Sequence, residues 1–282
     1  SPFPRKADIE IRTKQDPHGS RLALQTLRPS GEPVAHMIAV RYPPDRATLP
    51  EFALYFVRRV GELETRLEQD EAARILGAIL ERNLDIRTVS LLGYGSFGVA
   101  ATHKNHVLKL TTDHTEIAAA NALVGKKLRH VVRFYQAAFI EGFTMVRRGG
   151  YKLREVGIVL SEKLGEIGTN DGQGNLLDGI VLEAKSEFGI FGLDWDALDD
   201  EDARAAICDA SLALEERLFQ ELGSLREIAL GLEELRSHGI CLVDTHAKNI
   251  GYGPDGVHKI FDVGVASSPQ DAVPRMAGRD RG

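Results

Sequence analysis

Residues 238–264, HGICLVDTHAKNIGYGPDGVHKIFDVG, include Asp244, Asn249 and Asp262, three polar residues next to short apolar runs. Asn249 follows Asp244 by five positions, and Asp262 follows Asn249 by thirteen. A turn with Asp-Gly separates two strand-like segments, so we expect a loop and then a hairpin that bring the three side chains together. A carboxylate can accept a proton from a hydroxyl group, and an amide oxygen with a second carboxylate can hold Mg²⁺. The stretch therefore predicts a site that handles a proton and a metal ion.

Earlier in the chain, strand-like residues lead into a glycine-rich stretch, Gly93-Tyr-Gly95-Ser96-Phe97-Gly98. Its pattern, G-x-G-x-x-G, joins a strand to a helix in dinucleotide-binding units and covers ATP phosphates as a hairpin in another class of proteins. A second strand-like segment follows here, which favours the hairpin. Glycine lets the backbone approach phosphate groups closely. An ordinary glycine-rich turn explains this motif equally well when it is taken alone.

Lys109 lies in the next strand-like segment, Val107-Leu-Lys-Leu110, with apolar neighbours on both sides. A lysine at this place can reach nucleotide phosphates as a point charge, provided that a carboxylate holds it. Glu116 is the candidate, at the start of a helix that we expect from about Thr115 to Leu128. The alternatives are a lysine that reaches out to solvent and a glutamate that stabilises the helix dipole.

In this order, the segments resemble the protein kinases over roughly Thr88 to Ala266. The likeness is most specific in residues 238–264, which are similar to the H-G-I-x-x-x-D-x-x-x-x-N-I and K-I-x-D-x-G segments of that family. Residues 157–165, GIVLSEKLG, look like the segment that joins the two kinase lobes, although a plain core strand would have the same pattern. By this resemblance Ser161 would stand at the gatekeeper position next to adenine.

The resemblance implies a protein serine/threonine kinase that uses ATP and Mg²⁺. Asp244 would be the catalytic base, Lys109 would bind the α and β phosphates, and Glu116 would hold Lys109. Asn249 and Asp262 would bind Mg²⁺. The other residues implied to bind ATP are Gly93, Gly95, Ser96, Phe97, Gly98 and the backbones of Glu162 and Leu164.

The implied fold class is α+β, a bilobal protein kinase-like fold. Its β-rich N-lobe would comprise residues 86–164 and its shortened helical C-lobe residues 165–282. An N-terminal α/β extension, residues 1–85, resembles no family. Its first 45 or so residues suggest short strands, and two helices follow, the first capped by Thr48. The apolar spacings of that first helix continue through Leu67.

Apolar spacing also predicts the elements between the motifs. We expect strands at 131–140 and 157–160 and a loop at 165–179, which is rich in Gly, Asn and Asp. A single long helix would carry the leucines from Leu214 to Leu235.

Residues around the motifs depart from the protein kinase pattern. Leu242-Val243 stands where most members have His-Arg, and that arginine receives a phosphorylated activation loop, so we expect no such regulation. His246 stands two positions after Asp244, where protein kinases usually have lysine. The resulting pattern, Asp-x-His-x-x-Asn, is closer to that of aminoglycoside and choline kinases. Val263 replaces a phenylalanine of the metal motif, and Ala100 replaces a valine that covers adenine.

The end of the chain also departs from the protein kinase pattern. Only 18 residues follow Gly264, and they contain no Ala-Pro-Glu motif. We therefore expect neither an activation segment nor the usual peptide-docking helices. In this respect the chain resembles truncated kinases that some bacteria deliver into host cells and some kinases encoded by phages.

Two functions compete with protein phosphorylation. An interaction module could bind ATP without transferring phosphate, because the usual docking platform for a peptide is missing. A small-molecule phosphotransferase is suggested by His246, and transfer of AMP in place of phosphate is chemically open to the same site.

The composition limits the classes of partner that we expect. A net charge of −6 without a dense Lys/Arg stripe disfavours nucleic acid. No segment approaches the ~20 apolar residues of a membrane span, and no signal peptide is evident. Cys208 and Cys241 are too few for a disulfide framework, so we expect two separate buried thiols in a reducing compartment. The expected protein is cytoplasmic, in a host cytosol if it is a delivered effector or a phage product. Its partner would be a protein substrate, and residues 1–85 would contact that partner or the kinase-like domain.

Overall fold

This computed structural model describes residues 26–27, 33–34, 46–63, 65–149, 152–193, 201–264, 266–267 and 273–276. The chain forms two compact units, Ser1–Pro44 and Asp45–Gly282. In the first unit, β1 (Thr26–Leu27) pairs with β2 (Pro33–Val34) in antiparallel fashion. The other strands that we expected before residue 45, around Ile9–Thr13 and through Val40, lie outside the described residues.

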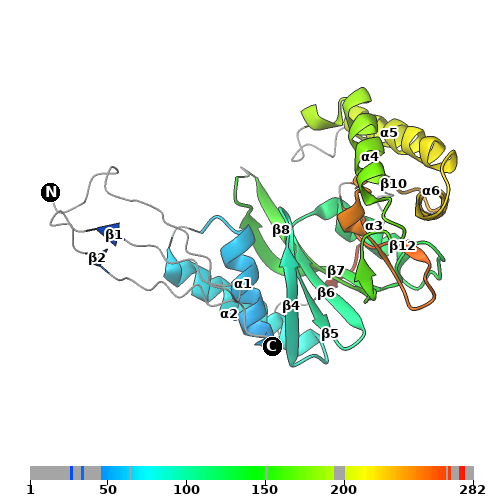
Figure 1. Cartoon of the computed structure of the whole chain (residues 1–282). Helices are drawn as coiled ribbons and strands as arrows, with labels where there is room; N and C mark the ends of the chain where they lie inside the picture. The colour runs from blue at the N-terminus through cyan, green and yellow to red at the C-terminus, as the bar shows by residue number, and fades with distance from the viewer. Residues whose placement is uncertain are drawn as a thin grey trace. The chain divides into compact units, whose positions relative to one another are not determined.

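The second unit has a mixed α+β fold built on one large sheet (Figure 1). The strand order is β14-β7-β8-β6-β5-β4-β3, and every described neighbouring pair is antiparallel except β14 and β7. The strands are β3 (Ala47–Thr48), β4 (Thr88–Tyr94), β5 (Gly98–His103), β6 (His106–Thr111), β7 (Phe134–Val146), β8 (Leu153–Glu162) and β14 (Arg275–Met276). The strands expected at 131–140 and 157–160 are thus present as the longer β7 and β8.

One face of this sheet is covered by α1 (Leu49–Val60) and α2 (Arg66–Asn83). The start of α1 is set by Thr48, whose side chain accepts a hydrogen bond from the backbone of Glu51 while Glu51 bonds back to Thr48. The helix ends at Val60 and a new one begins at Arg66, so Leu67 does not continue the apolar face of α1 as expected and is 80% exposed. Because α1 and α2 share a core with β4–β8, residue 85 falls inside the second unit.

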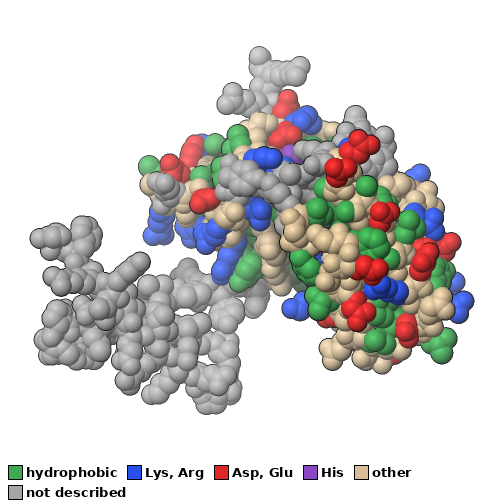
Figure 2. Space-filling view, turned by 90° about the horizontal axis from the view of Figure 1, so that it is seen from above, with side chains coloured by type: hydrophobic (Ala, Val, Ile, Leu, Met, Phe, Trp, Pro, Cys, Tyr) green, Lys and Arg blue, Asp and Glu red, His purple; other side chains and the backbone are tan. Residues whose placement is uncertain are grey.

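The other face of the sheet packs on α3 (His114–Leu123) and on the helical part of the unit. A continuous core runs from Ile117 of α3 through Phe134 and Val159 to Leu232 and Ile260. The helices α4, α5 and α6 gather on the side of the unit away from α1 and α2 (Figure 1). The helical part consists of α4 (Gly174–Glu187), α5 (Glu201–Phe219), α6 (Ser224–Arg236) and the small sheet β9 (Glu166–Ile167), β11 (Ile250–Tyr252) and β12 (His258–Ile260). Over this part, acidic and basic side chains are interspersed with apolar ones (Figure 2).

Two expectations about the helical part were wrong. The leucine pattern from Leu214 to Leu235 spans two helices, because the chain turns at Gly223 with a φ of 64°, a conformation that glycine adopts easily. Leu222, which belongs to this leucine pattern, lies between the two helices and is 72% exposed. The expected loop at 165–179 contains β9 and the first turns of α4, which begins at Gly174 without a side-chain cap.

The expectation of two separate buried thiols was also wrong. Cys208 of α5 and Cys241 of β10 (Cys241–Leu242) form a disulfide, and their Cα atoms are 4.9 Å apart. Both side chains are half-buried. The pairing follows from packing of β10 against α5, which sets the two Cα atoms within the range that a disulfide spans. Among the described residues, no helix is long and apolar enough to cross a membrane.

Candidate active site

Three charged side chains meet between the sheet and the helical part. In β6, Leu108 and Leu110 face α1 and α2, so the alternation of the strand turns Lys109 to the face that carries α3. Lys109 Nζ lies 2.6 Å from Glu116 Oε1 in the first turn of α3 and 2.8 Å from Asp262 Oδ2 just after β12. The structure thus brings together residues 153 positions apart and selects the ion pair over a solvent-facing Lys109.

The cluster combines two carboxyl groups with one ammonium group. Burial raises the pKa of Glu116 to about 8, and the charges of Asp262 and Asp113 act in the same direction, against the opposing effect of Lys109. For Lys109, burial is outweighed by the charges of Asp262 and Glu116, which raise the pKa of the ammonium group. For Asp262, burial is outweighed by Lys109 and by the N–H of Gly264, which lower the pKa. Glu116 therefore keeps its proton below about pH 8, and a cation bound nearby would favour its ionised form.

The hairpin formed by β11 and β12 joins Asn249 to Asp262. Ile250 pairs with Ile260, and the N–H of Phe261 donates to the carbonyl oxygen of Asn249 at 3.1 Å. The two residues therefore sit next to each other at the open end of the hairpin, as the sequence predicted. Asn249 Nδ2 donates to the backbone oxygen of Asp244 at 2.7 Å, which ties the third polar residue to the same place.

Asp244 lies near two basic side chains, of which only Lys185 makes a direct contact, and the sequence did not link Lys185 to Asp244. Its carboxylate forms an ion pair with Lys185 of α4. His246 Nε2 lies 3.9 Å from Asp244 Oδ2, beyond hydrogen-bond distance. Lys185 was missed because it lies 59 positions from Asp244, and nothing in the sequence of either segment indicates that the two meet.

The glycine-rich stretch is a hairpin turn between β4 and β5, with Tyr94 opposite Val99. A Cβ atom at residue 98 would lie 2.4 Å from the carbonyl oxygen of Leu110, so packing requires this glycine. A Cβ atom at Gly93 or Gly95 would meet no described atom within 4 Å, and neither residue has a positive φ. The fold itself does not require these two glycines.

The end of β8 carries the residues that we expected around adenine. Ser161 and Leu164 are buried. The N–H of Glu162 donates to the carbonyl of Arg133 at 2.8 Å, so only its carbonyl oxygen could serve a ligand. The carboxylate of Glu162 accepts hydrogen bonds from Lys259 Nζ at 3.1 and 2.9 Å. No described group accepts a hydrogen bond from the N–H of Leu164.

The oxygen atoms at the hairpin fit a Mg²⁺ ion that is held partly by the protein and partly by substrate phosphates. Among the described residues, no three His, Cys, Asp or Glu side chains converge on a common point. Because the amide nitrogen of Asn249 is bonded to Asp244, its amide oxygen is left for a ligand, and Asp262 adds a carboxylate. Proteins commonly hold Mg²⁺ through one or two such oxygens together with substrate phosphates.

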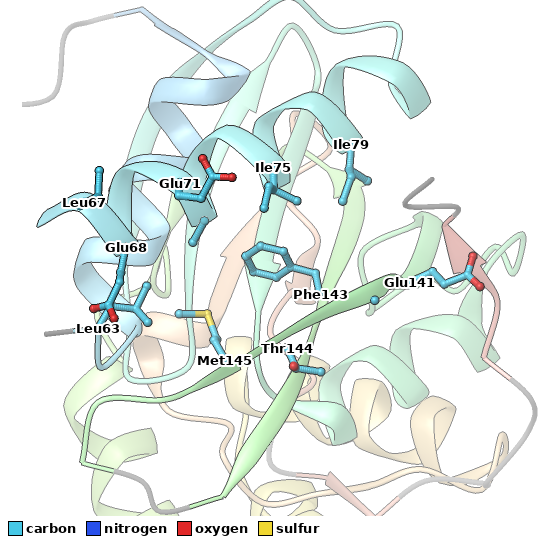
Figure 3. A pocket seen from close by; sticks show the side chains of 12 residues that line it. Leu63, Leu67, Glu68, Glu71, Ile75, Ile79, Glu141, Phe143, Thr144 and Met145 are labelled. Carbon is cyan, nitrogen blue, oxygen red and sulfur yellow. The ribbon is translucent and has the colours of Figure 1, made fainter. Parts of the chain in front are cut away.

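A groove of about 1020 Å³ lies elsewhere, between α2 and β7 (Figure 3). Ile75 and Ile79 of α2 lie across from Phe143 and Met145 of β7. Phe143 and Met145 belong to the core on the α1–α2 face, and Lys109 points to the opposite face. The groove is therefore separate from the polar cluster.

Comparison with known proteins finds no family model that matches this chain, and no curated protein matches it either.

Proposed function

We propose that this protein transfers the γ-phosphoryl group of ATP, with Mg²⁺, to the hydroxyl group of a protein serine or threonine. The observation that carries the proposal is the joining of Lys109, Glu116 and Asp262, at 2.6 and 2.8 Å, to the Asp244–Asn249 pair by a single hairpin. These are the groups that phosphoryl transfer needs for positioning and for charge stabilisation.

In this proposal Lys109 binds ATP phosphates and Glu116 fixes its position. Burial of Glu116 supports this role, since a side chain that is only 4% exposed has little freedom to leave the pair. Gly93 and Gly95 serve the same substrate, because glycines that the fold does not require allow phosphate oxygens to approach the backbone. Mg²⁺, held by Asn249 and Asp262, would neutralise charge on the phosphates.

Asp244 orients the attacking hydroxyl group and accepts its proton. Its side chain is 29% exposed, so a substrate hydroxyl can reach it. The hydrogen bond from Asn249 to the backbone of Asp244 keeps base and metal ligand in a fixed relation. The choice of a protein hydroxyl rests on the resemblance of residues 238–264 and of the Gly93–Gly98 hairpin to the protein kinases.

A small-molecule phosphotransferase is the second candidate. It is favoured by His246, which lies beside Asp244 where protein kinases have lysine. Mass spectrometry of the products separates the two candidates, because only one of them leaves phosphate on a protein.

The proposal is tested by phosphate transfer to proteins of a cell lysate, with Asp244→Asn as the test variant. Loss of a general base lowers the rate on the order of 10²–10⁴-fold. Asp255→Asn is the matched control, because Asp255 is an exposed aspartate in the turn of the same hairpin. Equal transfer by the wild type and Asp244→Asn would contradict the proposal.

A further inference from the structure

A second lysine lies at the site, on a helix far from Lys109 in the chain. We propose that Lys185 positions Asp244 and contacts the phosphoryl group during transfer. The inference rests on the proposed function and goes beyond it, because no feature of residues 238–264 points to α4.

One face of α4 is fastened to the loop that holds Asp244. Asp178 Oδ1 accepts a hydrogen bond from the N–H of Ala247 at 2.7 Å, and a Cβ atom at Gly174 would lie 3.2 Å from the Cβ atom of Ala247. Lys185 reaches the carboxylate of Asp244. Residues 174, 178 and 185 are spaced by four and seven positions and so share one side of the helix.

Most of the Lys185 side chain is covered by the protein. Its side chain is only 15% exposed, and a buried ammonium group requires a partner of opposite charge. Asp244 is that partner, and neither residue belongs to the apolar core. Lys259 is covered to a similar degree in its pair with Glu162, so it is the identity of the partner, the proposed base Asp244, that links Lys185 to the reaction.

His246 is not placed to do the same. Its Nδ1 accepts a hydrogen bond from the N–H of Lys248 at 3.2 Å and caps the short helix η2 (Ala247–Asn249). Its Nε2 remains 3.9 Å from Asp244. Of these two residues, Lys185 makes the direct contact with the carboxylate.

The chemistry follows from the three N–H donors of an ammonium group. In the step, the substrate oxygen forms a bond to the γ-phosphorus, and the bond from that phosphorus to the bridging oxygen of ADP breaks, leaving its electron pair on ADP. The hydroxyl proton passes to Asp244. One N–H of Lys185 holds Asp244, and the others can donate to the phosphoryl oxygens, where a fixed positive charge stabilises the transition state.

The test compares Lys185→Ala, Lys185→Arg and the double variant Lys185→Ala/His246→Lys by phosphate transfer and by Mg·ATP binding. Lys185→Ala should lower kcat by roughly 10²–10³-fold, the range for loss of one transition-state donor, with Mg·ATP affinity within about threefold of the wild type. Lys185→Arg should keep part of the activity. The double variant returns a lysine to the side of Asp244 and should recover at least about tenfold.

Lys126→Ala is the control, because Lys126 is exposed and distant in sequence from this loop. If the wild type is active and Lys185→Ala is at least as active, the inference about Lys185 is overturned while the proposed function stands. A Lys185→Ala variant that loses activity only together with Mg·ATP binding and folding would also overturn it. Wild type that transfers no phosphate would refute the proposed function itself, which separates the two failures.

Discussion

Lys109 of β6 and Glu116 of α3 are joined by a 2.6 Å ion pair that ties the sheet to α3. Glu116 follows Lys109 by only seven positions, and its side chain is 4% exposed. The same ammonium group also holds Asp262, so this pair links the sheet to the β11–β12 hairpin.

Glu116→Ala should weaken both stability and activity. The variant leaves Lys109 with Asp262 alone, and a hydrogen bond to a charged group contributes about 1.5–3 kcal/mol. We expect the free energy of unfolding to fall by that amount and the KM for ATP to rise. Urea unfolding and initial rates measure the two effects. Wild-type values for both would show that the pair has neither role.

Stability should depend on pH through Glu116. Its pKa is raised from 4.5 to about 8 in the folded protein, so the folded state retains a proton that the unfolded state has lost between these values. The contribution of Glu116 is fully present below pH 4.5 and is lost as the pH rises through about 8. The free energy of unfolding of Glu116→Gln, relative to that of the wild type, should therefore increase over this range. Urea unfolding of both proteins across the range measures it, and a constant difference would contradict the raised pKa.

Two glycines of the hairpin, Gly95 and Gly98, should respond differently to substitution by alanine. Gly98→Ala places a Cβ atom 2.4 Å from the Leu110 carbonyl and should destabilise the fold by about 1–3 kcal/mol. Gly95→Ala has free space and should change stability by less than about 0.5 kcal/mol while raising the KM for ATP. Unfolding and kinetic measurements on both variants test this contrast. If Gly95→Ala left the KM unchanged, the hairpin would not cover phosphates.

The Cys208–Cys241 disulfide should stabilise the helical part. It closes a loop with a sequence separation of 33, and disulfides typically contribute about 2–4 kcal/mol. Reductant should therefore lower the melting temperature of the wild type. The Cys208→Ala/Cys241→Ala variant is the control and should melt at a lower temperature that reductant does not change. A wild type indifferent to reductant would show that the bond does not form in solution.

Local spacing predicted the part of the site that local structure builds. Asn249 and Asp262 are joined by one hairpin, and Lys109 and Glu116 by one strand and one helix start, so alternation and turn signals were sufficient. Lys185 is 59 positions from Asp244, and nothing in either segment indicates that they meet. The same holds for the packing of α5 on β10 that pairs the cysteines.

The predicted helix boundaries were wrong where the apolar spacing continued through a break between two helices. The leucines before and after Gly223 keep a helical period, yet a φ of 64° there ends one helix and starts another. Leu67 likewise continues the apolar period of α1, but α1 ends at Val60 and Leu67 belongs to α2, which begins at Arg66. Spacing records which residues suit a helix face, and it does not record the backbone turn between two helices.

Labelling with ATP that carries the isotope at either the γ or the α phosphorus tests the central claim most directly. Wild-type protein, a cell lysate and Mg²⁺ are incubated with each form, next to Asp244→Asn and Asp255→Asn. We predict protein-bound label from γ-labelled ATP alone, present with Asp255→Asn and reduced on the order of 10²–10⁴-fold with Asp244→Asn. Label from α-labelled ATP, or equal γ label with Asp244→Asn, would contradict the account.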